Sequence, residues 1–337
     1  MLGNNTFGID LGTSQVKIYS QKHDSITVEK NMVAIRNKKQ LLAIGDAAFD
    51  MFEKNPPNIV VETTVREGSL YDIDKAEALL HLLLQKVEPH IGIGPHLYFS
   101  APSSRSALEE QAYYAAACAG YLKNPKVYLI DRPICDAIAL GIPLSRTEGS
   151  MVVNIGAQNT DVSVIAHEQV IISKSIPIGG QQINSAICDM IRRQTNLLVG
   201  HRTARRLKAV LATLEKDSDE ARKVVGLNIL SGLPRDGVVP ARLVNEAVRE
   251  QLLILSAEIR EFIERTPPQI GKSIANEGIY LTGGTTRIPG IENFFRESCR
   301  CPVNVSYYYD QCTIKGLKEL ITHKPLHKWA YAVKDKR

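Results

Sequence analysis

Long apolar runs are missing from this sequence, and so are the cysteine patterns of secreted and metal-binding domains. No stretch reaches the ~18 apolar residues that a membrane-spanning helix needs, because Asp10 and Lys17 interrupt the N-terminal run. No secretory signal precedes Phe7. The six cysteines are dispersed, and the pair Cys299 and Cys301 has neither a second pair nor a histidine cluster near it. We therefore expect a cytoplasmic protein with free thiols.

Two motifs that bind nucleotide phosphates are also absent. The chain contains no G-x-x-x-x-G-K-[ST] loop and no strand-linked G-x-G-x-x-G fingerprint. A net charge of +5 does not by itself indicate nucleic-acid binding. A basic cluster lies at helical spacing without interleaved aromatic residues, which favours a solvated face or a protein contact over a nucleic-acid patch. Its members are Arg192, Arg193, His201, Arg202, Arg205, Arg206 and Lys208. We expect no nucleic-acid partner.

What the sequence does contain is a pair of similar glycine loops. Residues 7–17 read FGIDLGTSQVK, and residues 152–164 read VVNIGAQNTDVSV. In each loop an apolar strand is followed by Asp10 or Asn154, an aliphatic residue, a glycine and small polar residues. A strand that ends in this way turns at the glycine, and its backbone N–H groups can bind a phosphate. The pair predicts a duplicated unit that holds one phosphorylated ligand from two sides.

Strands and helices alternate along the chain, which at 337 residues is long enough for two domains. An amphipathic helix is predicted over residues 73–87, with Asp72 or Asp74 as its N-cap and leucines on its buried face. Residues 182–260 are expected to be mostly helical. A third glycine turn, at Gly283 and Gly284, follows another apolar strand. These patterns predict mixed α/β layers and favour a nucleotide cleft.

Several segments carry a specific resemblance. IDLGTS (residues 9–14) resembles the first phosphate loop of the actin, sugar kinase and heat-shock chaperone ATPases. The segment IPIGGQQINSAICDMIRRQTNLLVGHRTARRLK (residues 176–208) is similar to MreB, as are GSMVVNIGAQNTDVSVI, IYLTGGTTRIPG, and GDAAF with the following NIV. From residue 7 to about residue 320 the chain resembles the MreB/Mbl family of bacterial actins. The most discriminating piece is NLLVGHRTA, which chaperones and sugar kinases lack.

This resemblance implies an α/β, actin-like ATPase fold. It consists of two duplicated α/β domains, each with a smaller subdomain, and a nucleotide cleft between them. The first domain would span residues 1–145, with a peripheral subdomain over about 28–67. The second would span residues 146–305, with a helical subdomain over about 181–240. Residues 306–337 would return to the first domain and end in a basic tail.

The resemblance also implies ATP and Mg²⁺ as cofactors. Asp10 would hold a hydrated magnesium ion, and Lys208 would border the adenosine. Lys17 has the spacing of a phosphate-contacting lysine in eukaryotic actin, although a lone lysine on a strand is equally compatible with solvent exposure. The implied nucleotide-binding residues are Asp10, Gly12, Thr13, Ser14, Gln15, Lys17, Asn154, Gly156, Ala157, Gln158, Arg205, Lys208, Gly283, Gly284, Thr285 and Thr286.

Four sites, one of them the second loop, depart from the family pattern. The second loop usually reads D-I-G-G-G-T-T, but this chain has Asn154 and Asn159 at two of its positions, and an amide lacks the charge that a metal-bound water prefers. Arg132 replaces the water-orienting glutamate, and arginine has no acceptor. Val210 replaces the ribose-binding glutamate, and Thr285 replaces a glycine. Because losing one positioned catalytic group costs ~10²–10⁴ in rate, we expect slow or absent ATP hydrolysis.

The resemblance implies a cytoskeletal protein that binds ATP and forms filaments at the inner face of the cytoplasmic membrane. There it would help determine cell shape by scaffolding the cell-wall elongation machinery. One alternative is a fully active filament ATPase, in which Asp131 or Asp161 orients the water. The other is a membrane-recruited adaptor that resembles FtsA or PilM, although NLLVGHRTA argues against it. Either the loop with Ile91 and Ile93 or the basic tail with Trp329 would contact the membrane, and a buried role for the loop is equally compatible.

Overall fold

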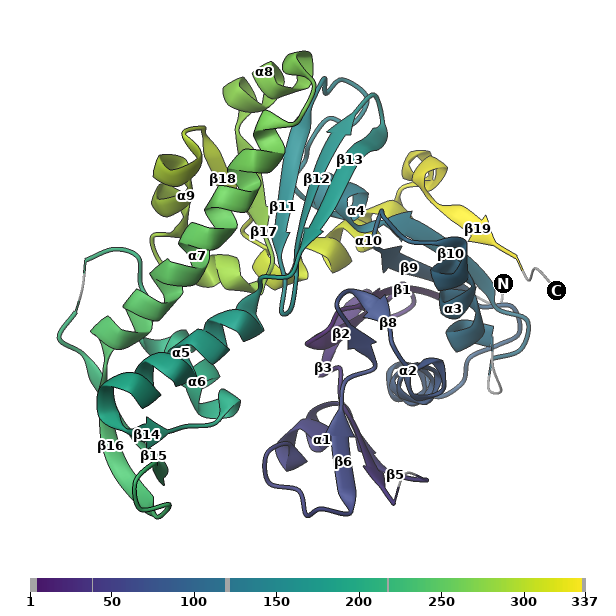
Figure 1. The fold of residues 1–337 in the computed structure, drawn as a ribbon. Coiled ribbons are helices and arrows are strands. Elements are labelled where there is room, and N and C mark those ends of the chain that lie inside the picture. Colours follow the sequence, from purple (N-terminus) through teal and green to yellow (C-terminus); the bar gives the residue numbers. More distant parts are fainter. Residues whose placement is uncertain (1–4, 38, 119–121, 217, 335–337) are drawn as a thin grey trace. The chain divides into compact units, whose positions relative to one another are not determined.

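The computed structural model describes residues 5–37, 39–118, 122–216 and 218–334 (Figure 1). The chain divides into two compact units. The first comprises residues 1–147, 163–173 and 310–337, and the second comprises residues 148–162 and 174–309. In both units strands of a mixed sheet alternate with helices, as the sequence predicts.

A six-stranded sheet forms the centre of the first unit. Its strands are β1 (Thr6–Leu11), β2 (Gln15–Ser20), β3 (Ser25–Lys30), β9 (His96–Ala101), β10 (Lys126–Asp131) and β19 (Tyr331–Val333). Their order is β19-β10-β9-β1-β2-β3. The strands β1, β9 and β10 are parallel, and β2, β3 and β19 are antiparallel to their neighbours. All of β1 is buried, with Phe7, Ile9 and Leu11 in the core.

Helices cover this sheet. They are α2 (Ile73–Val87), α3 (Ala107–Cys118), α4 (Arg132–Ala139) and α10 (Cys312–Thr322), and the short 3₁₀ helix η3 (Lys324–Trp329) follows α10. The helix predicted over residues 73–87 is confirmed, and its N-cap is Asp72, whose side chain accepts from the Lys75 N–H. Among its leucines Leu82 is exposed and the others are buried. The helices α4 and α10 pack on each other, and α10 also contacts β1.

A smaller sheet extends from the first unit. It consists of β4 (Val33–Arg36), β5 (Gln40–Ile44) and β6 (Ile59–Glu62), and α1 (Gly45–Met51) packs on it. Ala34, Ala48 and Ile59 form its own small core. A two-stranded hairpin, β7 (Val65–Arg66) and β8 (Ser69–Leu70), follows. Because β3 pairs with β2 up to Lys30, the small sheet begins only at Val33.

The second unit repeats the architecture of the first. Its main sheet consists of β11 (Ser150–Ile155), β17 (Ile279–Thr282) and β18 (Val303–Val305), together with β12 (Thr160–Ala166) and β13 (Gln169–Ile176), of which residues 163–173 are grouped with the first unit. Their order is β13-β12-β11-β17-β18, with β11, β17 and β18 parallel. This matches the order β3-β2-β1-β9-β10, so the predicted duplication of the fold is confirmed. The helices are α5 (Gly180–Thr195), α6 (His201–Leu211), α7 (Ala241–Glu264), α8 (Pro268–Glu277), α9 (Ile291–Cys299) and the 3₁₀ helices η1 (Gly284–Arg287) and η2 (Tyr309–Gln311).

The expectation of a helical subdomain over residues 181–240 is wrong for its second half. After α5 and α6 the chain forms an antiparallel sheet of β14 (Leu197–Leu198), β15 (Ala221–Asn228) and β16 (Pro234–Pro240). The β-branched valines of this segment favour strands, and Gly232 lies in the turn with φ +68°. Gly226 and Gly237 pack against Leu197, where a Cβ on either glycine would clash. The sheet therefore forms beside the helices.

Candidate nucleotide-binding site

A buried row of polar side chains lies at the first glycine loop. Asp10 on β1 is the register partner of Lys17 on β2 and of Ser100 on β9. Lys17 Nζ lies 3.3 Å from Asp10 Oδ2, and Ser100 Oγ donates to Asp10 Oδ1 at 2.8 Å. Asp10 and Lys17 are each only 5% exposed. Lys17 is therefore not a solvent-exposed strand residue.

The charges around Asp10 keep its carboxylate ionised. Burial by itself raises the pKa of Asp10, but the charges of Lys17 and Arg132 and the hydrogen bond from Ser100 outweigh burial and lower the pKa below its ordinary value. Arg132 is the first residue of α4, directly after β10. The residue at the family's water-orienting position therefore supplies positive charge to the first loop.

The two glycine loops make the same turn. In the first, the Gly12 N–H donates to the Gln15 carbonyl at 3.0 Å, and in the second the Gly156 N–H donates to the Asn159 carbonyl at 2.9 Å. A Cβ at Gly12 or Gly156 would lie 3.0 or 2.9 Å from the same carbonyl oxygen. Both turns therefore favour glycine for the same steric reason.

Two residues that sequence reasoning missed hold the first loop in place. Asn31, which is fully buried after β3, donates its side-chain amide to the Gly12 carbonyl at 2.9 Å and its backbone N–H to the Ser14 carbonyl at 3.1 Å. Thr63 Oγ1 donates to the Thr13 carbonyl at 3.1 Å. The loop's carbonyl groups are thus bound by the protein. Asn31 stands in a polar stretch that gives no sign of this role in the sequence.

The second loop packs against the N-terminus of α5. The Gly180 N–H donates to the Gly156 carbonyl at 3.0 Å, and the Gln181 N–H donates to the Ala157 carbonyl at 2.7 Å. The Gly179 N–H donates to Gln182 Oε1. These N–H groups at the helix start, which often bind anions in other proteins, are therefore already hydrogen-bonded within the protein.

A second buried cation lies beside this helix start. Lys208 on α6 donates from Nζ to the Gly180 carbonyl at 2.6 Å. A Cβ on Gly180 would lie 3.3 Å from that Nζ and 3.4 Å from Thr285 Oγ1 on η1, so the three residues converge. Burial and the neighbouring charge of Arg205 lower the pKa of Lys208 to about 7.

The glycine turn before η1 cannot accept a side chain. Gly283 has φ +97°, and a Cβ there would lie 2.3 Å from the Ile155 carbonyl oxygen at the end of β11. Thr286 Oγ1 donates to the Gly283 carbonyl at 2.7 Å, which closes the turn. Gly284, Thr285 and Thr286 form η1 itself.

The structure thus brings the predicted site residues together in two groups. In the first unit Asp10, Gly12, Thr13, Ser14, Gln15 and Lys17 lie at the β1–β2 turn. In the second unit the other predicted residues lie at β11, the β11–β12 turn, α6 and the turn with η1: Asn154, Gly156, Ala157, Gln158, Arg205, Lys208, Gly283, Gly284, Thr285 and Thr286. Val210, at the expected ribose position, has an exposed apolar side chain.

Both acids that were considered as substitutes for the missing glutamate are hydrogen-bonded elsewhere. Asp131 Oδ1 accepts from Arg105 Nη1 at 2.5 Å. Asp161 Oδ1 accepts from Ser175 Oγ at 2.8 Å. Each carboxylate therefore already accepts a hydrogen bond from a protein side chain, instead of one from a water molecule at the glycine loops.

The metal chemistry of the first loop is limited to one carboxylate. Among the described residues no group of three or more His, Cys, Asp and Glu side chains could hold a metal ion. Both oxygens of Asp10 already accept hydrogen bonds, from Ser100 and Lys17. This donor set fits a Mg²⁺ ion that keeps its own water shell, as Mg²⁺ commonly does.

The duplicated fold and the paired glycine loops are those of an actin-like ATPase. The model of the family described as MreB/Mbl protein matches residues 4–328. The chain belongs to the MreB/Mbl family of bacterial actins. It is 31% identical over 312 residues to the cell shape-determining protein Mbl of Bacillus subtilis (strain 168), which covers 92% of this chain and 93% of the relative.

Solved structures agree with this assignment. The crystal structure of MreB5 of Spiroplasma citri bound to ADP is 25% identical, covers 97% of this chain and 98% of its own, and has a TM-score of 0.88. The same protein bound to AMPPNP gives a TM-score of 0.89. The MamK double helical filament shares the fold at 18% identity, with a TM-score of 0.78.

Lys208 should make the stability of the second unit depend on pH. Its pKa is about 7 in the folded protein and near 10.5 when exposed, so between these values the unfolded chain holds a proton that the folded chain lacks. Stability should therefore rise with pH over this window, by about 2–4 kcal/mol relative to Lys208→Met. Urea unfolding at pH 7, 8.5 and 10 measures this. The exposed Lys54→Met is the control, and equal pH slopes in wild type and Lys208→Met would contradict the effect.

Proposed function

We propose that this chain is a filament-forming cytoskeletal protein that binds ATP with Mg²⁺ and hydrolyses it slowly or not at all. The observation that carries the proposal is the buried row of Lys17, Asp10 and Ser100 with the charge of Arg132 beside it. Two cations and an ionised carboxylate at a glycine turn suit a phosphate–magnesium group. The same arrangement contains no acceptor at the position where the family orients water.

Each unit, taken by itself, has features that support nucleotide binding. In the first, Asn31 and Thr63 hold the carbonyl groups of Gly12, Thr13 and Ser14, and the Gly12 N–H donates to Gln15, so the Thr13 and Ser14 amides are the ones proposed to bind phosphate oxygens. In the second, the convergence of Gly180, Lys208 and Thr285 suits the adenosine end. The related MreB5 of Spiroplasma citri has been solved with ADP and with AMPPNP, which supports a nucleotide ligand here.

We expect slow hydrolysis because the side chains at the family's catalytic positions can neither orient the water nor supply the negative charge. Arg132 has no acceptor for a water proton, and Asn154 supplies no charge. Asp131 and Asp161 accept hydrogen bonds from Arg105 and Ser175. A fully active ATPase would require one of these acids to leave its partner. Arg132 instead favours holding ATP, because it can neutralise phosphate charge.

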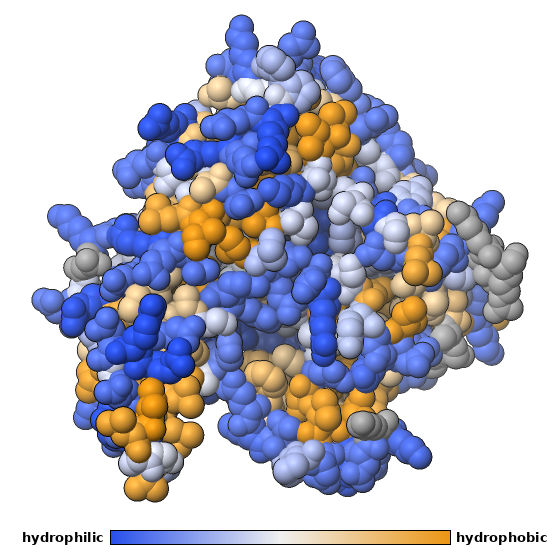
Figure 2. Space-filling model, viewed as in Figure 1, coloured by the Kyte–Doolittle hydropathy of each residue, from blue (hydrophilic) through white to orange (hydrophobic). Residues whose placement is uncertain are grey.

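Self-association and a role in cell shape are proposed from the family. The relatives Mbl and MreB are cell shape-determining proteins by name, and the fold is shared with a double helical filament. Figure 2 shows apolar side chains gathered on the β15–β16 hairpin, which suits a contact with another copy. They are Val225, Leu227, Ile229, Leu230, Leu233 and Val238. The cell-wall elongation machinery is the proposed partner of the filament.

A peripheral membrane contact from the cytoplasmic side belongs to the same proposal. No described helix is long and apolar enough to cross a bilayer. In the loop before β9, Ile91 packs on the core of the first unit, whereas Ile93 is 76% exposed. A single exposed isoleucine binds a bilayer weakly, so filaments would be needed to add many such contacts. An adaptor of the FtsA or PilM kind would instead bind vesicles without polymerising.

ATP turnover at saturating Mg·ATP tests the proposal. Wild-type turnover should lie near the rate without protein, whereas the double variant Arg132→Glu with Asn154→Asp should be at least about tenfold faster, because it restores an acceptor and a carboxylate. Arg36→Glu, on the exposed end of β4, controls for the charge change of Arg132→Glu. Wild-type turnover equal to that of an active MreB would contradict slow hydrolysis. Absence of Mg·ATP binding by calorimetry would contradict the nucleotide site itself.

A further inference from the structure

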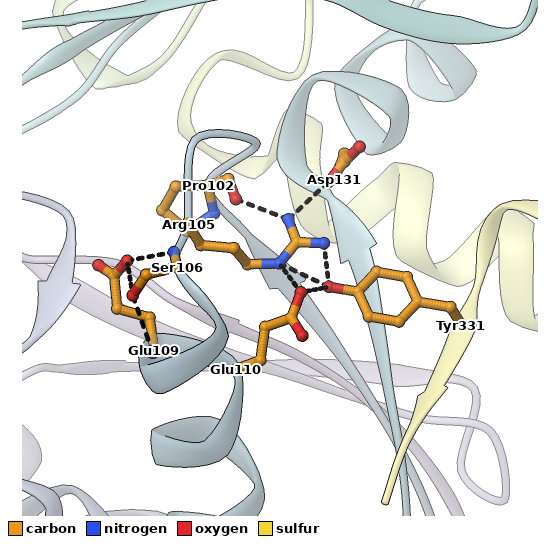
Figure 3. A network of polar contacts seen from close by, with 7 residues as sticks. All are labelled: Pro102, Arg105, Ser106, Glu109, Glu110, Asp131 and Tyr331. Carbon is orange, nitrogen blue, oxygen red and sulfur yellow. Dashed lines mark hydrogen bonds and ion pairs between the residues drawn. The ribbon is translucent and has the colours of Figure 1, made fainter.

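An arginine outside the glycine loops makes a dense set of contacts in the first unit (Figure 3). The side chain of Arg105, which follows β9, is only 7% exposed. Its Nη1 donates to the Pro102 carbonyl at 2.6 Å and to Asp131 Oδ1 at 2.5 Å. Its Nε donates to Tyr331 Oη at 2.6 Å and lies 3.5 Å from Glu110 Oε1. One guanidinium therefore joins three separate segments of the chain.

Two of these segments contain a residue that acts on Asp10. Pro102 follows Ser100 by two residues, and Ser100 donates to Asp10. Asp131 immediately precedes Arg132, whose charge lowers the pKa of Asp10. By binding Pro102 and Asp131 together, Arg105 fixes the ends of β9 and β10 relative to each other at the level of the first loop.

Asp131 has an unusual role at the start of α4. It is the N-cap residue, and aspartate is among the preferred caps, yet its side chain makes no capping hydrogen bond. Because Pro133 has no N–H, the Ile134 N–H is the donor that a capping carboxylate would use. Arg105 holds the carboxylate instead. Released from Arg105, Asp131 would turn to cap α4 and bring a second negative charge toward Asp10.

The third segment is the C-terminal strand β19. It pairs antiparallel with β10, where Tyr331 lies opposite Leu129. Tyr331 Oη accepts from Arg105 and donates to Glu110 Oε1 at 2.8 Å, and its ring lies 5.0 Å from the Arg105 guanidinium carbon. The family model matches only to residue 328, so Tyr331 lies beyond the segment that this chain shares with the family model.

We propose that Arg105 and Tyr331 are positioning residues for the nucleotide site, with Tyr331 holding Arg105 and Arg105 keeping the Asp131 carboxylate away from α4. The C-terminal strand thereby controls how much negative charge a bound phosphate meets at the first loop. The inference rests on the proposed ATP binding for its functional readout. Its structural part stands on the contacts of Arg105 alone.

The affinity for Mg·ATP, measured by calorimetry, tests the inference. Arg105→Leu should weaken binding about tenfold, and the milder Tyr331→Phe about threefold, because one or more charge-assisted hydrogen bonds are lost. Adding Asp131→Asn to Arg105→Leu should restore binding to within about twofold of wild type, since the freed side chain is then neutral. Tyr71→Phe, at an arginine–tyrosine stack elsewhere in the first unit, is the matched control and should bind as wild type does.

A merely structural role predicts different results. If Arg105 only stabilises the fold, the Asp131→Asn addition will not restore affinity, and the inference is overturned. Equal affinities for wild type and Tyr331→Phe would overturn the role of the C-terminal strand, and this variant keeps the test valid if Arg105→Leu does not fold. If wild type binds no ATP, the proposed function fails. Amide hydrogen exchange then tests separately whether Arg105 and Tyr331 keep Asp131 away from α4. The Ile134 amide should then exchange more slowly in Tyr331→Phe than in Tyr71→Phe, and equal rates would refute it.

Discussion

Gly316→Ala should destabilise the first unit by about 3 kcal/mol or more, although alanine is ordinarily the better helix residue. Gly316 lies in α10 where this helix crosses α4, and a Cβ there would lie 1.8 Å from the Cys135 carbonyl oxygen. That oxygen belongs to the backbone of α4, so no side-chain rotation relieves the clash. The two helices would have to separate, and the buried hydrogen bond from Thr313 Oγ1 to Asp136 Oδ1 would be strained with them.

Urea unfolding followed by tryptophan fluorescence measures this effect. Trp329 is the single tryptophan of the chain, and its Nε1 donates to the Glu168 carbonyl within the first unit. The control is Gly271→Ala in α8, where the nearest atom to a new Cβ is Thr266 Oγ1 at 3.3 Å. That variant should be neutral or more stable by up to about 1 kcal/mol. A Gly316→Ala protein with wild-type stability would show that the α4–α10 contact is looser than described.

Lys17→Met should cost about 3–5 kcal/mol of unfolding free energy and weaken Mg·ATP binding. It leaves Asp10 buried without its paired lysine, and breaking one half of a buried pair is costly. The double variant Lys17→Met with Asp10→Asn should recover much of the stability, because no buried charge then lacks a partner. Its ATP affinity should stay low, since the charges of Lys17 and Asp10 are both gone.

The comparison with an exposed pair isolates the effect of burial. Lys86 pairs with Glu29, but its side chain is 64% exposed, so Lys86→Met should cost at most about 1 kcal/mol. Equal losses for Lys17→Met and Lys86→Met would mean that the Asp10–Lys17 pair is as well hydrated as a surface pair. Normal Mg·ATP affinity in Lys17→Met would remove Lys17 from the proposed site.

A pH series adds a further check, because the pKa of Asp10 is lowered in the folded protein. The stabilising contribution of the Asp10 carboxylate is present above its ordinary pKa and is lost as the pH falls through its pKa in the folded protein.

The sequence predicted the duplicated α/β fold well because the duplication is visible locally. Both glycine turns have the same steric requirement, at Gly12 and Gly156, and both follow apolar strands. The helix over residues 73–87 was also predictable, since its leucine spacing and its Asp72 cap are properties of neighbouring residues. Family resemblance added the order of the segments between these landmarks.

What the sequence could not predict depends on residues far apart in the chain. The strands β15 and β16 lie where the sequence predicts helix, because apolar and polar residues do not alternate cleanly along them and their packing on Leu197 is a tertiary contact. Asn31 and Ser100 acquire their roles only when β3 and β9 bring them to the first loop. Arg105 contacts Asp131 and Tyr331, which lie 26 and 226 residues further along the chain. Contacts of this kind leave no periodic signal.

The pairing of β1 with β2 restricts how the two strands can slide past each other. Asp10 and Lys17 face each other across an antiparallel register, and alternate residues of a strand point to opposite faces of the sheet. A slip of β2 by one residue would turn Lys17 to the other face and leave Asp10 without this cation, whereas a longer turn that kept the register would leave the pair intact. An insertion in the turn that abolishes the pair should therefore act through a change of register and not through the length of the loop itself.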